Sequence, residues 1–233
     1  MDLRYISGEQ LMEEIRKKAR KRRILTAVIL VIGIILTVLC FNVAVGAGIV
    51  TTCFLVLIPL AVFWHYCKKI KNVQNIPLFR LHGSPEELAA LIRNSSDSVL
   101  YQSNTFLLTS KYIMNPNNLE TIIPLTDLQL AYIHTSSYNG IPTQQSLKTH
   151  DIYNNQVDYN FKLGKKGKAE IVEILTAIQQ NAPWVIVGYS PQNVSYAAKN
   201  KIKVGDPKPV RQMPQNAAPA QNPVPPVMDG IPQ

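Results

Sequence analysis

The chain has 233 residues, 46% of them hydrophobic, and a formal net charge of +9. This length allows one or two ordinary domains. The positive charge is concentrated beside apolar segments: residues 1–23 contain eight Lys or Arg and four acids, whereas residues 76–204 contain eleven Lys or Arg and nine acids. A nucleic-acid-binding protein carries its excess positive charge on a folded surface, so this distribution argues against a nucleic-acid partner.

Residues 1–23 predict a basic amphipathic helix. Ser7 and Gln10 have the spacing of a capping box, and Leu11 and Ile15 share one helical face. Seven of the eight residues 16–23 are Lys or Arg. Two arrangements fit this pattern: a helix lying in the membrane interface with its bases on anionic head groups, or a solvated extension of the apolar run that follows.

Two apolar runs without Asp, Glu, Lys or Arg follow, at residues 24–41 and 49–66. At about 1.5 Å per helical residue, the first run reaches roughly 27 Å, close to the roughly 30 Å hydrocarbon core of a bilayer. Backbone groups in lipid must be bonded within the segment, so we expect a hairpin of two membrane-spanning helices over residues 24–66. The alternatives are a buried hairpin of a soluble protein and a cleaved export signal, although a signal has an apolar run of only roughly 7–15 residues.

The charges around the two runs predict their orientation, because short loops rich in Lys and Arg stay on the cytoplasmic side. Basic residues precede the first run and follow the second, and the connection between the runs has no charge. We therefore expect a multi-pass protein of the cell (inner) membrane with both termini in the cytoplasm. Gly33, Gly46 and Gly48 would allow close helix contacts, either within the chain or in a homo-oligomer.

Residues 76–204 predict a cytoplasmic domain of the α+β class. A helix starts at Ser84, with Pro85 and Glu87 at first-turn and capping-box positions. The hydrophobic period then changes to two, which indicates antiparallel strands joined by hairpins. The segments that read as strands are residues 98–103, 105–114, 120–125, 128–135, 148–154 and 156–163.

Helical periodicity returns after the strands. Ile171, Ile174 and Ile178 form part of an apolar stripe that would cover one face of the sheet. Pro183 ends this helix, a short strand follows, and Pro191 starts a last helix. Together these elements predict an antiparallel sheet or partial barrel that is capped by helices.

Residues 205–233 contain eight of the sixteen prolines and almost no large apolar side chains, which predicts a disordered tail. Pro223 and Pro226 have the P-x-x-P spacing of a docking motif, although such spacing arises easily in any proline-rich tail.

The sequence predicts no catalytic residue, no cofactor and no metal site. The four histidines have no Cys or His neighbour at metal-ligand spacing, and His150 and Asp151 point to opposite faces if they lie on a strand. The candidates for binding are cationic residues that would contact the membrane surface or a phosphate, or that simply form solvated basic segments. These residues are Arg16, Lys17, Lys18, Arg20, Lys21, Arg22, Arg23, Lys68, Lys69, Lys71, Lys165, Lys166 and Lys168.

The segment "TFLLTSKYIMNPNNLETIIPLTDLQLAYIHT" resembles a run in the pleckstrin-homology-like domains of small bacterial membrane proteins. Thr109 and Lys111 match its threonine and basic residue, and Ile123-Pro124-Leu125 with Asp127 match its I-P-L run and acid. The layout of two spans followed by this domain is similar to an uncharacterised bacterial family of two-span membrane proteins. The resemblance implies a binding or scaffolding module and brings no catalytic residues.

We therefore expect a membrane-anchored, non-enzymatic module whose cytoplasmic domain binds lipid head groups or a protein that the sequence does not identify. The alternative is an accessory or regulatory subunit of a membrane transport complex. Functional spans usually carry an ionisable residue within the membrane, and neither run has one.

Overall fold

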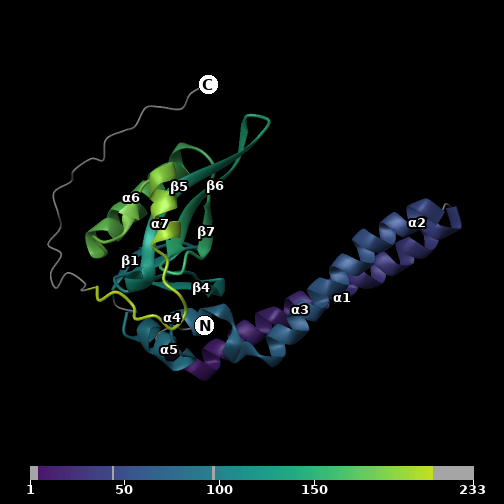
Figure 1. The fold of residues 1–233 in the computed structure, drawn as a ribbon, viewed down its shortest axis with the longest axis horizontal. Helices are drawn as coiled ribbons and strands as arrows, with labels where there is room; N and C mark the ends of the chain where they lie inside the picture. The colour runs from purple at the N-terminus through teal and green to yellow at the C-terminus, as the bar shows by residue number, and fades with distance from the viewer. Residues whose placement is uncertain (1–4, 44, 96–97, 212–233) are drawn as a thin grey trace.

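The computed structural model describes residues 5–43, 45–95 and 98–211. It combines a long helical hairpin with an α+β domain that contains two four-stranded sheets. Figure 1 shows the hairpin projecting from the base of this domain, so that its far end lies well away from the sheets.

Helix α1 (Gly8–Val43) is a single helix of 36 residues that contains both the basic segment and the first apolar run. Its start has the predicted capping box: the Gln10 N–H donates to Ser7 Oγ at 3.1 Å, and the Ser7 N–H donates to Gln10 Oε1 at 2.9 Å. Leu11 and Ile15 are buried in a core of the domain. The first turns of α1 therefore belong to the folded domain. This differs from both expected arrangements, a helix lying in the membrane interface and a solvated extension of the apolar run.

The second arm of the hairpin runs back alongside α1 as α2 (Val45–Thr51), the π-helical segment η2 (Thr52–Leu57) and α3 (Ile58–Lys71). Pro59 has no N–H to donate to the Leu55 oxygen, and a π-helical turn is one way in which a helix accommodates such a gap. Gly33 of α1 faces that oxygen, because a Cβ at position 33 would lie 2.1 Å from it. The close approach of the two arms therefore requires glycine at this position.

Three short helices connect the hairpin to the sheets: η3 (Val73–Asn75), α4 (Pro77–His82) and α5 (Pro85–Arg93). The predicted capping box of α5 is present, with the Ser84 N–H donating to Glu87 Oε2 at 2.7 Å and the Glu87 N–H donating to Ser84 Oγ at 3.3 Å. Helix α4 was not predicted, since six residues are too few to display a helical period.

The first sheet is an antiparallel meander of β1 (Val99–Gln102), β2 (Leu107–Thr109), β3 (Tyr112–Asn115) and β4 (Asn118–Pro124). The segment predicted as strand at residues 105–114 holds two strands, because a tight turn separates them. Thr109 Oγ1 stabilises this turn by accepting from the backbone N–H groups of Lys111 and Tyr112, at 3.2 and 3.1 Å.

The second sheet pairs β5 (Leu128–Tyr138), β6 (Ile141–Asp151) and β7 (Gln156–Phe161) in antiparallel order, with β8 (Ile186–Val187) parallel to β5 at its edge. Asn139 and Gly140 form the two-residue turn of the β5–β6 hairpin with φ values of 50° and 77°. Strand β6 starts seven residues before the predicted strand 148–154, since the outer half of this hairpin is polar and shows no alternation.

Helices α6 (Lys165–Asn181) and α7 (Pro191–Lys199) complete the domain, and Figure 1 shows both beside the second sheet. The first sheet separates two cores. One core lies between the two sheets and α6, whereas the other joins the first sheet to α1, α4 and α5. Neighbouring strand residues alternate between them: Phe106, Leu108, Ile113 and Ile123 face the first core, and Leu107, Tyr112, Met114 and Ile122 face the second.

Candidate functional site

The basic residues of the hairpin lie together at the end that joins the domain. Arg16, Lys17, Lys18, Arg20, Lys21, Arg22 and Arg23 lie on α1, and Lys68, Lys69 and Lys71 lie in the last turn of α3. The two arms run in opposite directions, so their basic ends meet beside the first sheet (Figure 1). Lys165, Lys166 and Lys168 are exposed at the start of α6, which lies away from this basic end.

Several of these cations already have partners. Arg16 and Arg20 both contact the Glu13 carboxylate, at 2.6 and 3.4 Å, on the exposed side of α1. Lys69 forms an ion pair with Glu120 of β4, and Lys18 Nζ donates to the Asn117 carbonyl oxygen at 2.7 Å. The last two contacts connect the helical hairpin to the β3–β4 hairpin and align the basic end with the domain.

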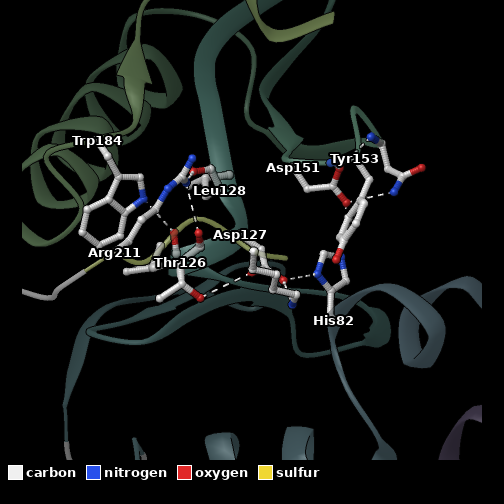
Figure 2. A network of polar contacts seen from close by, with 11 residues as sticks. His82, Thr126, Asp127, Leu128, Asp151, Tyr153, Trp184 and Arg211 are labelled. Atoms are coloured by element: carbon white, nitrogen blue, oxygen red, sulfur yellow. Dashed lines mark hydrogen bonds and ion pairs between the residues drawn. The ribbon is translucent and has the colours of Figure 1, made fainter. Parts of the chain in front are cut away.

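A second polar site lies between α4 and the second sheet, and its residues are buried. Figure 2 shows His82 between two carboxylates: Nδ1 is 2.8 Å from Asp127 Oδ2, and Nε2 is 3.3 Å from Asp151 Oδ2. Only 6% of the His82 side chain is exposed, and 2% and 1% of the Asp127 and Asp151 side chains. With a carboxylate at each ring nitrogen, the doubly protonated imidazolium satisfies both contacts.

The pKa values of this cluster shift in the directions that favour an ion pair. Burial acts to lower the pKa of His82, but hydrogen bonds and charge interactions with Asp127 and Asp151 outweigh it, so the pKa is raised. Burial acts to raise the pKa of Asp127, but its contacts with His82 and Lys208 outweigh that cost, so this pKa is lowered. Asp151 also accepts hydrogen bonds from the backbone N–H groups of Tyr153 and Asn155, at 2.9 and 2.7 Å.

The segment that follows α7 closes this cluster. Lys208 Nζ donates to Asp127 Oδ2 at 2.6 Å. Arg211 Nη1 donates to the carbonyl oxygens of Thr126 and Leu128, at 3.0 and 2.7 Å (Figure 2). The Arg211 guanidinium also lies over the Trp184 ring, 5.7 Å from its centre. Residues 205–211 of the predicted disordered tail therefore lie against the domain, whereas Pro223 and Pro226 are outside the described residues.

The buried cluster joins α4, the second sheet and the segment after α7. Asp127 and Asp151 are enclosed, and their oxygens are occupied by His82, Lys208 and backbone N–H groups. Within residues 5–43, 45–95 and 98–211, no group of three or more His, Cys, Asp or Glu has the geometry of a metal site. His150 and Asp151 have different partners: the His150 ring lies against Tyr132, whereas Asp151 contacts His82.

No sequence pattern pointed to this cluster. His82 is 45 residues before Asp127 and 69 before Asp151 in the chain, so only the fold brings them together. The available signal was a charged residue, Asp127, placed between the buried end of β4 and another apolar strand.

Comparisons with known proteins leave the family open: no family model, no curated protein and no solved structure matches the chain.

Proposed function

We propose that this chain is a membrane-anchored binding module, whose helical hairpin crosses the bilayer and whose α+β domain binds a protein partner or lipid head groups at the cytoplasmic surface. The observation that carries the proposal is the exposure of the apolar side chains of the hairpin. Two helical stretches, Gly8–Val43 and Gly48–Lys71, are long and apolar enough to cross a membrane, and only 17% and 11% of their most apolar windows are buried.

Water is an unfavourable solvent for so many exposed apolar side chains. Ile35, Leu39 and Trp64 are among many large apolar side chains exposed along both arms. Burying one such side chain contributes about 1.5–3 kcal/mol, and water-soluble monomers rarely expose contiguous apolar patches above a few hundred Å². Lipid removes this penalty, and helical backbone satisfies its own polar groups there. In a core helix of a soluble protein, most of these apolar side chains would be buried.

The charge distribution supports a cytoplasmic domain in the cell membrane. The Lys and Arg clusters of α1 and α3 lie at the end of the hairpin that joins the domain, and the far end carries no charge. The positive-inside rule then favours the domain, and both ends of the chain, on the cytoplasmic side.

The arrangement of the strands supports a pleckstrin-homology-like partial barrel. Four antiparallel strands are followed by three more, and a long helix then packs on the core between the two sheets. Helices α4 and α5, and the β8–α7 extension, are additions to such a barrel. A fold of this kind is consistent with a binding role, although folds do not determine function by themselves.

The β5–β6 hairpin offers an exposed surface for a protein partner. Tyr138 and Ile141 flank its turn with 72% and 68% of their surface exposed, and residues 135–147 carry no charge. An exposed aromatic residue beside an aliphatic one is the composition favoured at the centre of protein interfaces.

The test has two parts. The full chain should stay in the membrane fraction after an alkaline carbonate wash, and protease added outside intact cells should leave the domain uncut. Photocrosslinking at Tyr138 in intact membranes should then capture a discrete partner, with crosslinking at Ser136 of the same hairpin as the control. A soluble chain, or a domain digested from outside, would contradict the proposal.

A further inference from the structure

A groove between α1 and the β3–β4 hairpin lies at the basic end of the two arms. It has a volume of about 510 Å³ and is lined by Lys17, Lys18 and Lys21 of α1 and by residues 116–120 of the β3–β4 hairpin. Glu14 and Glu120 also line it, but Glu14 contacts Lys17 at 3.5 Å and Glu120 is paired with Lys69. Neither Lys18 nor Lys21 forms an ion pair within the part of the chain that the structure describes.

Asn118, on the opposite side of the groove, has a buried acceptor without a donor among the described residues. This acceptor is its side-chain oxygen, Oδ1. An unpaired buried acceptor is unfavourable, so a rotation of the Asn118 side chain that brings Oδ1 to a ligand hydroxyl in the groove gains binding energy.

The electrostatics of the groove favour an anion. Burial, followed by the charge of Arg22, lowers the pKa of Lys18; Glu120 opposes the shift, and Lys69 adds to it. A bound anion near Lys18 would offset both the burial and the repulsion from the neighbouring cations. Lys18 already places one hydrogen bond on the Asn117 oxygen, which orients its ammonium group beside the groove.

The position of the groove along α1 matches the head-group layer. With the apolar run starting at Ile24, Lys21 is about 4.5 Å and Lys17 about 10 Å from the hydrocarbon boundary along the helix. The polar layer on each side of a bilayer is roughly 5–8 Å thick. Lys21 therefore lies within that layer, and Lys17 lies just beyond it.

We propose that this groove binds the head group of an anionic phospholipid that carries a free hydroxyl, such as a phosphoglycerol. Its phosphodiester contacts the ammonium groups of Lys18 and Lys21, and a head-group hydroxyl donates to Asn118 Oδ1. This inference rests on the proposed function, because a lipid reaches the groove only if the hairpin lies in the bilayer.

The experiment uses the full chain in nanodiscs of neutral phosphatidylcholine with traces of photoactivatable lipids. A probe with a reactive phosphoglycerol head group should label residues 116–120, and K18Q/K21Q should reduce that labelling roughly tenfold, the effect of losing one or two charge-assisted hydrogen bonds. The matched control is R16Q/R20Q, which removes the same charge from the same helix outside the groove and should keep the labelling. Equal losses in the two double variants would mean non-specific attraction and overturn the site.

The contact between the head-group hydroxyl and Asn118 is tested by comparing two competitor lipids. The unchanged chain should prefer unlabelled phosphatidylglycerol over phosphatidylmethanol as competitor, because the two lipids share the phosphodiester and only the first has hydroxyl groups. N118A should remove this preference and leave the phosphatidylmethanol competition unchanged. A preference that survives N118A would contradict the role of Asn118.

Two further measurements distinguish an error about the ligand from an error about the membrane anchor. Soluble glycerophosphoglycerol that abolishes labelling at low concentration would identify a free metabolite, rather than a lipid, as the ligand. A probe with its reactive group in the acyl chain should label residues 24–66 in every variant. Loss of that labelling would contradict the membrane anchor itself, whereas loss of head-group labelling alone would contradict only the groove.

Discussion

The same aliphatic side chains have opposite surroundings in the two parts of this molecule. In the domain, Ile113, Ile171 and Ile174 are completely buried, whereas Ile29, Ile32 and Ile35 of the helical hairpin are between 46% and 56% exposed. Composition alone therefore does not locate a core.

The difference lies in the arrangement of the apolar residues along the chain. In the domain they alternate with polar residues on strands or form one stripe of a helix, so each element has a face to bury. In the hairpin they surround the helix, so most of them have no protein neighbour to pack against. A segment of this kind needs apolar surroundings, which we propose to be the bilayer.

The first way to test this contrast is to truncate one isoleucine in each part. Ile174→Ala removes a completely buried side chain and should lower the free energy of unfolding of the domain by about 2–5 kcal/mol. Ile35→Ala should change it by less than about 0.5 kcal/mol, since that side chain is 56% exposed and belongs to no core of the domain. Denaturant titration of the full chain in micelles, followed by near-UV circular dichroism, measures both. Equal effects would contradict the contrast.

The ion-paired cluster gives the domain a pH dependence that the hairpin does not share. Because the pKa of His82 is raised above its usual 6.5, its stabilising effect is complete below pH 6.5 and is lost as the pH rises through the folded-state value. The lowered pKa of Asp127 acts at the other end, so its contribution is present above 3.8 and is lost as the pH falls. The domain should therefore become less stable as the pH rises above 6.5.

His82→Gln is the variant that isolates this effect. It should reduce the stability of the domain by about 3 kcal/mol at pH 6, as expected when a buried ion pair loses one partner, and remove most of the loss at alkaline pH. His134→Gln is the control, because His134 is only partly buried and contacts Ser136 rather than a carboxylate. Thermal unfolding at several pH values measures the difference, and an unchanged pH profile in His82→Gln would exclude the cluster as its origin.

The contact between the two arms should be less costly to disturb. Gly33→Ala places a Cβ 2.1 Å from the Leu55 oxygen, so the arms must separate, at a cost of about 1–3 kcal/mol. Gly46→Ala is the matched control, since a Cβ there meets no atom of the described residues within 4 Å. The distance between spin labels on α1 and α3 should increase in Gly33→Ala only; no change would mean that this close contact does not hold the arms together.

The smallest effect is expected at the segment after α7. Lys208→Ala removes one charge-assisted hydrogen bond to Asp127 from a side chain that is partly exposed, which should loosen residues 203–211 by about 1 kcal/mol. Amide hydrogen exchange in that segment should become roughly fivefold faster. Lys203→Ala removes the same charge from an exposed position and should have no such effect. Similar exchange rates in both variants would mean that Lys208 does not hold the segment.

Local chemistry made much of the fold predictable. The capping boxes at Ser7 and Ser84 depend on residues three apart, and the strands and α6 show their periods within a few residues. The burial of Leu11 and Ile15 in the domain core was not predictable, because a short apolar stripe looks the same against protein and against lipid.

The polar sites depend on contacts between distant parts of the chain. The sequence identified Lys17, Lys18 and Lys21 as a basic run, but not the groove that they form with the β3–β4 hairpin about 100 residues later, because nothing local specifies which hairpin lies beside α1. His82, Asp127 and Asp151 are ordinary residues in their own segments and become a cluster only when α4 packs on the second sheet.

The most direct test of the account measures the solvent around the helical hairpin. Nitroxide labels are placed one at a time at residues 24, 29, 35 and 39 of α1, with residue 137 as an aqueous control, and the chain is kept in its own membranes. We expect collisions with oxygen to increase, and collisions with a water-soluble nickel chelate to decrease, from residue 24 towards residue 35. Labels at residues 29 and 35 that meet the nickel chelate as often as the label at residue 137 would show that water surrounds the hairpin, and the membrane anchor would be wrong.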